Sequence, residues 1–147
     1  GKNERIAKGL LSGIFIGLIY SVFIGIVLVT NGSTISWLFV DRSETQVLDA
    51  VQQFLTFSGF FYWLLPILGC TRMTIQGLGF GAVAIFAGCS ELAARGLMSL
   101  FAIPAFGYTA VCVTDQTAWL AATIMVVIIF SRINRRLTGK KRIKKRI

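Results

Sequence analysis

The segment from Leu10 to Thr30 carries no charged side chain over 21 residues. As a helix rising about 1.5 Å per residue it reaches about 30 Å, which is the thickness of the hydrocarbon core of a bilayer. The whole chain of 147 residues is 55% hydrophobic and only 14% charged, whereas soluble domains average about 25% charged residues. These features predict an all-α, polytopic membrane protein and make a soluble core a poor interpretation.

Three later segments are also apolar enough to be membrane-spanning helices. Together the four predicted spans cover residues 10–30, 51–70, 78–103 and 117–131, followed by a basic tail at 132–147. Pro66 lies within the second span, where it should kink or weaken the last turns, and it is a candidate hinge. Pro104 is expected to end the third span. The chain then forms a single transmembrane domain of four helices.

Small residues recur at every fourth position along the first span, at Gly9, Gly13, Gly17, Ser21 and Gly25. Positions four apart lie on one face of a helix, and small side chains there let a second helix approach closely. We therefore predict that this stripe packs against another helix.

The net charge of +9 is distributed unevenly along the chain. Three basic residues precede the first span, Arg72 lies between the second and third spans, and nine basic residues follow the fourth span, whereas only Arg42 lies in the loops of the opposite side. The positive-inside rule then predicts a multi-pass protein of the cell membrane with both ends of the chain in the cytoplasm. No aromatic or groove-reading motif accompanies the basic tail, so nucleic-acid binding is not expected.

The sequence carries no enzyme signature. It contains no histidine, no Gly-x-Ser-x-Gly elbow and no Walker loop, and its three cysteines fit no metal or redox spacing. We expect no catalytic residue, no metal site and no organic cofactor. Transport, channel and scaffold functions remain.

Glu91 and Arg95 are the charged pair of the third span, with Glu91 expected near the bilayer midplane. A charged side chain at that depth costs about 2.5–3.5 kcal/mol on insertion scales, so it needs a partner or a use. The two residues are four apart and share a helix face. Either they form an intrahelical ion pair, or Glu91 binds a proton, sodium or a cationic substrate while Arg95 tunes its affinity.

Two further groups are candidate substrate contacts. Tyr62 and Trp63 belong to an aromatic cluster in the second span, which serves either helix packing and lipid contact or the wall of a cavity for flat organic cations. Gln76 follows the second span, in a segment predicted to be a break between helices.

Several short motifs occur in an order that is recognisable as a family pattern. They are the basic linker at Gly1–Arg5, Arg72 with Gln76-Gly77-Leu78-Gly79, Ser90-Glu91-Leu92 with Arg95, Phe106-Gly107-Tyr108, and Ala118-Trp119-Leu120. On these motifs the chain resembles the C-terminal third of a transporter of the multidrug and toxic compound extrusion (MATE) family. The resemblance covers nearly the whole chain.

The resemblance implies a twelve-helix protein with two six-helix lobes, of which these spans would be helices nine to twelve. Such transporters exchange organic cations and drugs for sodium or protons by alternating access. The implied partners are membrane lipid, the remaining eight helices and a small organic substrate, and this part alone should not transport. Several branches carry a coupling carboxylate midway along the tenth helix. Tyr62–Leu68 contains none, so a coupling carboxylate in these spans would have to be Glu91; otherwise the resemblance implies that the coupling site lies among the remaining helices.

Two other functions compete with that of an antiporter. A small four-helix exporter acting as a dimer would carry its essential glutamate in the first span, which is uncharged here. A non-transporting membrane scaffold would use the glycine stripe for packing and Glu91–Arg95 purely as a structural pair.

Overall fold

The computed structural model describes residues 2–37 and 44–144. Every regular element in this part of the chain is helical, as predicted. Three stretches are long and apolar enough to cross a membrane, at Arg5–Gly32, Ile85–Phe106 and Tyr108–Arg135, and a bent helix pair makes a fourth if it counts as one span. The chain is therefore compatible with a membrane protein of three to four spans.

Helix α1 (Lys2–Ser36) contains the first predicted span and extends beyond it at both ends. Its large apolar side chains point mostly outward, where water would be a poor solvent for them and lipid a good one. The exposed ones include Leu11, Phe15, Ile16, Ile19, Tyr20, Val22, Phe23 and Ile26.

The second predicted span consists of two helices, α2 (Thr45–Phe61) and α3 (Leu64–Gly77), bent by 56° at Tyr62–Trp63. Pro66 has no N–H to offer the carbonyl of Tyr62, and its ring crowds the same carbonyl. That carbonyl instead accepts a 3.2 Å hydrogen bond from the N–H of Leu65. The predicted kink is confirmed, but its position was wrong, because a proline disturbs the turn that precedes it.

Helix α4 (Gly81–Leu97) follows a tight turn in which Gly79 has a φ of +88°. Arg72, predicted to lie in this break, instead lies inside α3. The prediction that Pro104 ends the third span is also wrong. A π-helical turn at Met98–Ala102 widens the helix ahead of the proline and leads into α5 (Ile103–Phe106), and the chain turns only at Gly107, where φ is +60°.

Helix α6 (Tyr108–Lys144) is longer than the fourth predicted span, because it continues through most of the basic tail. It contacts every other α-helix of the bundle. A buried apolar cluster joins it to α3 and α4, and its members are Leu68, Ile75, Ala87, Ala122, Val126 and Ile133.

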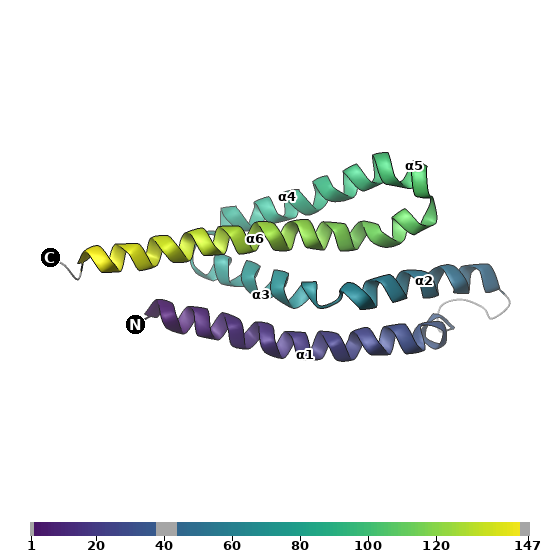
Figure 1. Cartoon of the computed structure of the whole chain (residues 1–147), viewed down its shortest axis with the longest axis horizontal. Helices are drawn as coiled ribbons and strands as arrows, with labels where there is room; N and C mark the ends of the chain where they lie inside the picture. The colour runs from purple at the N-terminus through teal and green to yellow at the C-terminus, as the bar shows by residue number, and fades with distance from the viewer. Residues whose placement is uncertain (1, 38–43, 145–147) are drawn as a thin grey trace.

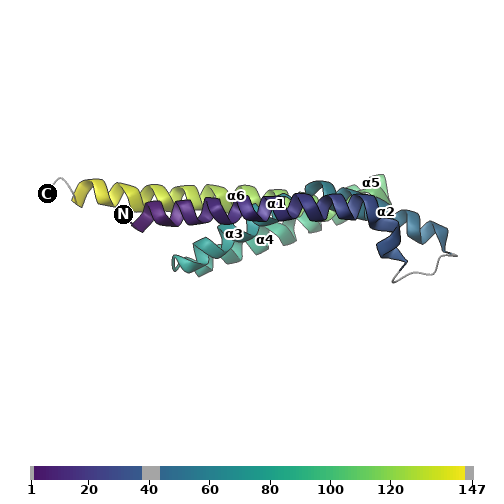
Figure 2. The ribbon, with the colours of Figure 1, turned by 90° about the horizontal axis from the view of Figure 1, so that it is seen from below.

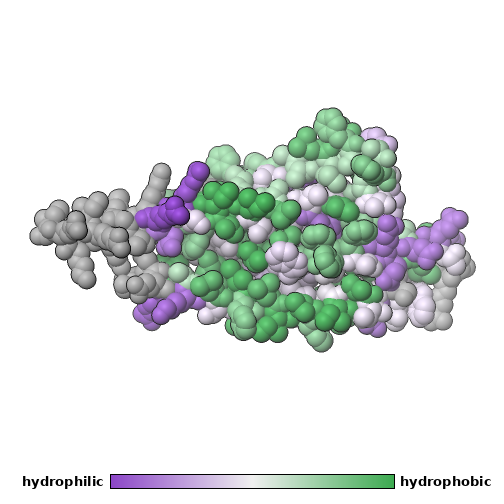
Figure 3. Space-filling view, viewed as in Figure 1, coloured by the Kyte–Doolittle hydropathy of each residue, from purple (hydrophilic) through white to green (hydrophobic). Residues whose placement is uncertain are grey.

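The helices form a row in which α1 packs on α2 and α3, these pack on α6, and α6 packs on α4 (Figure 1). In the view turned by 90°, α3 and α4 diverge from α1 and α6 toward the turn that connects them (Figure 2). The start of α1, the α3–α4 turn and the end of α6 lie at one end of the bundle. Hydrophobic residues cover its middle, whereas hydrophilic ones gather at its two ends (Figure 3).

The glycine stripe of α1 faces α2 and α3, as predicted. A Cβ atom on Gly17 would lie 2.5 Å from Cβ of Pro66, and one on Gly25 would lie 2.6 Å from the carbonyl oxygen of Gly59. Gly13 is packed less tightly, since a Cβ there would lie 3.7 Å from the Sγ atom of Cys70, and nothing lies within 4 Å of a Cβ on Gly9. The closest approach of α1 to its neighbours is therefore at Gly17 and Gly25.

Candidate functional site

Glu91 forms an ion pair with Arg72 of the neighbouring helix. Nη1 of Arg72 lies 3.1 Å from Oε1 of Glu91, and the two side chains are 32% and 18% exposed. A Cβ atom on Gly88 would lie 3.3 Å from the Arg72 guanidinium, so this glycine leaves room for the arginine over α4. The pair thus ties α3 to α4 beside the turn that connects them.

Arg95 forms a second ion pair, with Asp115 of α6. Nε of Arg95 lies 3.0 Å from Oδ1 of Asp115, and the side chains are 44% and 37% exposed. Arg95 lies halfway along the apolar stretch Ile85–Phe106, so it is nearer the middle of the span than Glu91. This pair therefore joins α4 to α6 at a depth where exposed charge is unexpected.

The intrahelical pairing of Glu91 with Arg95 was one of two predictions for these residues, and it is wrong. Each of them reaches across to a different helix, because α4 packs against both α3 and α6, and each of these two helices supplies an opposite charge. Arg72 and Asp115 were missed as partners because both were assigned to connecting segments outside the spans. The apolar run Ala110–Val113, which ends just before Asp115, was the signal that could have extended the fourth span to include it.

A row of hydrogen bonds joins α2 to α6. The Tyr108 hydroxyl donates to the carbonyl of Ala50 at 3.0 Å, and the Gln53 amide donates to the Thr109 hydroxyl at 3.4 Å. Further along, the Gln116 amide donates to the Ser58 hydroxyl at 3.1 Å. The two helices run in the same direction, so these bonds hold them together over two to three turns.

Gln116 is the most buried polar residue of this row, with 2% of its surface exposed. Its amide oxygen has no hydrogen-bond partner, and the same holds for Oε1 of Gln52 and Oγ1 of Thr123. A buried polar atom without a partner costs about 1–3 kcal/mol. These atoms are therefore places where a water molecule or a polar group of another helix would stabilise the bundle.

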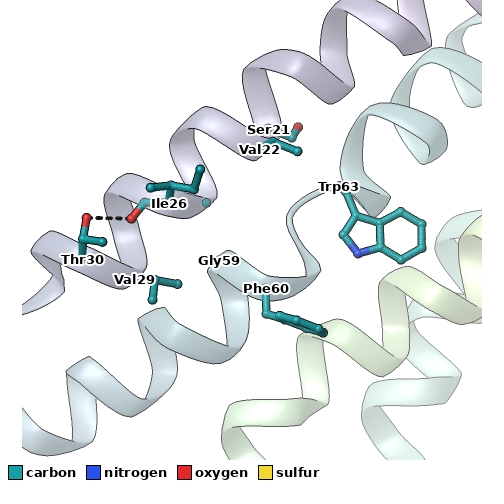
Figure 4. Close-up of a pocket in the computed structure, with 9 residues that line it drawn as sticks. Ser21, Val22, Ile26, Val29, Thr30, Gly59, Phe60 and Trp63 are labelled. Carbon is teal, nitrogen blue, oxygen red and sulfur yellow. Dashed lines mark hydrogen bonds between the residues drawn. The ribbon is translucent and has the colours of Figure 1, made fainter.

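Tyr62 and Trp63 do not line one cavity, contrary to the prediction that they form the wall of a cavity for flat organic cations. Tyr62 packs edge-on against Trp119 of α6, with ring centroids 6.4 Å apart. Trp63 instead lines a groove of about 330 Å³ between α1 and the α2–α3 break (Figure 4). No charged side chain is among the described residues that line this groove, so a cation would meet there only the aromatic faces of Trp63 and Phe60 and uncharged polar groups such as the hydroxyls of Ser21 and Thr30.

Gln76 and Pro66 lie apart from the two ion pairs. Gln76 is one turn beyond Arg72 on the same face of α3, and its side chain is exposed at the end of the helix. Pro66 packs directly against Gly17 of α1, beside the α2–α3 break. The hinge candidate therefore has a close neighbour in α1, which restricts bending of the break toward that helix.

Among the residues that the structure describes, no three His, Cys, Asp or Glu side chains are grouped so that they could hold a metal ion. No protein-family model matches the sequence, and neither a curated protein nor a solved structure is significantly similar to it. The functional assignment therefore depends on the motifs and on the geometry of the charged residues.

Proposed function

We propose that this chain is the C-terminal part of a cation-coupled multidrug antiporter of the MATE type, inactive without the remaining eight helices. Its support is the ordered set of motifs together with the geometry of the charged residues. In this proposal the protein exchanges sodium or protons for small organic cations by alternating access, with both ends of the bundle's chain in the cytoplasm.

The Arg95–Asp115 pair is the observation that carries the proposal. Charged side chains at membrane depth almost always face a bundle interior or a water-filled cavity. This pair is more than a third exposed and lies on the apolar body of the bundle. In the complete protein the surface between α4 and α6 therefore faces water or other helices, as the wall of a transport pathway does.

The two carboxylates have different roles in this proposal. Glu91 is 18% exposed and holds α3 and α4 together through Arg72, whereas Asp115 is 37% exposed and can be reached by a small ion. We therefore assign the coupling role to Asp115 and Arg95, and the structural role to Glu91 and Arg72. The break at Tyr62–Trp63 fits this assignment, because discontinuous helices are common beside the binding sites of transporters.

Asp115→Asn in the full-length protein should lower gradient-driven efflux of ethidium about tenfold, the effect of about 1.4 kcal/mol of lost coupling free energy. Exchange of ethidium without a gradient should continue in proteoliposomes, because only the coupling is removed. The matched control is the Arg95→Gln, Asp115→Asn double variant, which removes both charges. Normal efflux by this double variant would show that the pair is structural and would contradict a coupling role for Asp115.

The orientation can be tested with single cysteines placed at the two ends of the bundle, in a variant without the three native ones. Gln76→Cys lies beside the α3–α4 turn and Glu44→Cys lies just before α2, and both positions are exposed. An impermeant thiol reagent should label Glu44→Cys in intact cells and Gln76→Cys only after permeabilisation. The opposite pattern would invert the topology. Native Cys112 is unsuitable for this measurement because it is fully buried.

A further inference from the structure

A second surface of the molecule, on α6 beyond the ion pairs, has a different chemistry. Five residues there line a hollow of about 230 Å³, and they are Val127, Ile128, Ser131, Arg132 and Arg135. Neighbouring members of this set are one, three or four residues apart in the sequence, so they form a single stripe on one face of the helix. The stripe changes from apolar to basic along its length, because Val127 and Ile128 come first and the two arginines come last.

The position of this hollow along the helix is that of a membrane–water interface. Val127 and Ile128 are 42% and 47% exposed and belong to the apolar stretch Tyr108–Arg135, of which Arg135 is the last residue. Beyond it α6 continues into the basic segment that ends at Lys144. The apolar part of the hollow therefore lies at the depth of acyl chains, and the basic part lies at the depth of headgroups.

Among the side chains that the structure describes, none supplies a counter-charge to these arginines. The two ion pairs there use Arg72 and Arg95, and they engage Glu91 and Asp115. The other two carboxylates among these side chains, Glu44 and Asp49, belong to the start of α2 at the opposite end of the bundle. Arg132 and Arg135 are both exposed and are one turn apart, so their guanidinium groups can engage one anion.

We propose that the stripe from Val127 to Arg135 is a binding site for one acidic phospholipid. The arginines bind the phosphate through paired N–H donors, the Ser131 hydroxyl donates a further hydrogen bond, and the first carbons of an acyl chain lie on Val127 and Ile128. The hollow is too small to enclose a whole lipid, so it holds the headgroup and the beginning of the chains. This inference needs the bundle to lie in a bilayer, but it does not depend on transport.

A free phosphate is the other anion that could use the arginines. It would gain nothing from the apolar half of the hollow, whereas a phospholipid uses both halves at once. The charge and the hydropathy of the stripe therefore favour the lipid, and the two occupants can be separated by competition.

The test is native mass spectrometry of the purified protein with phosphatidylglycerol and, separately, phosphatidylcholine. The Arg132→Gln, Arg135→Gln variant should reduce phosphatidylglycerol binding by about fivefold for each arginine removed, since a basic residue near an acidic lipid surface contributes about 1 kcal/mol. Phosphatidylcholine binding should change little, because its headgroup carries no net charge.

The matched control is Arg5→Gln, Lys8→Gln, which removes the same charge from exposed positions near the start of α1, at the same end of the bundle. We expect this variant to bind phosphatidylglycerol nearly as well as the parent protein. Equal losses in both variants would mean diffuse attraction by the basic residues at this end of the bundle and would overturn the site. Displacement of the lipid by an excess of inorganic phosphate would overturn the lipid assignment in favour of a soluble anion. The helical content and thermal stability of each variant, measured in detergent, show that the protein remains folded.

Discussion

Gly25→Val should separate α1 from the rest of the bundle and cost more than about 3 kcal/mol of folding free energy. Overpacking a well-packed site costs about 1–3 kcal/mol when side chains can shift. Here a Cβ atom would lie 2.6 Å from a backbone carbonyl oxygen, that of Gly59, which cannot move without moving α2. The expected result is a loss of monodisperse protein in detergent and a lower midpoint of thermal unfolding.

Gly9→Val is the matched control, because it adds the same side chain to the same helix and nothing lies within 4 Å of its Cβ. It should leave the yield and the melting midpoint close to those of the parent protein. Gly17→Val, which meets Pro66, should behave like Gly25→Val. If Gly25→Val were as stable as Gly9→Val, the close approach of α1 to α2 would be wrong.

Glu91→Arg alone should destabilise the bundle by about 2 kcal/mol, since breaking a buried ion pair costs about 3–5 kcal/mol and these side chains are partly exposed. Adding Arg72→Glu restores opposite charges across α3 and α4, 3.1 Å apart in the parent protein. The double variant should therefore recover most of the lost stability. Thermal unfolding of the single and double variants in detergent gives the coupling between the two sites.

A second charge reversal distinguishes this pairing from an intrahelical one. Glu91→Arg together with Arg95→Glu would place two arginines together at Arg72 and two carboxylates together at Asp115. We expect that variant to be less stable than either single change. Recovery of stability in this variant, and not in the variant with Arg72→Glu, would contradict both interhelical ion pairs.

Local patterns in the sequence predicted the helices well, but not which of their charges meet. The uncharged run Leu10–Thr30 and the stripe of glycines sufficed to place α1 and the face through which it packs. The partner of Glu91 depends on where α3 ends relative to α4. That register is set by the tight turn at Gly79 and by packing against α6, and no short-range pattern encodes it.

The two prolines likewise show what local sequence predicts and what depends on the tertiary structure. The sequence indicated that Pro66 disturbs a helix, but the disturbance falls on the turn before it, at Tyr62–Trp63. Pro104 was expected to end a helix, and a π-helical turn absorbs it instead. At Pro66 the chain bends by 56°, whereas at Pro104 the helical path continues to Phe106, and a local proline rule does not distinguish the two outcomes.

Helices α2 and α3 have 17 and 14 residues, so they reach only about 25 Å and 21 Å. Neither length crosses a bilayer core of about 30 Å, whereas α1 and α6 are each long enough to do so. In a bilayer, α2 and α3 would therefore cross the hydrocarbon core only together, as one bent span. The helices that pack on this broken span are α1, which precedes it in the chain, and α6, which follows it, so its packing is completed by a helix that is synthesised after it.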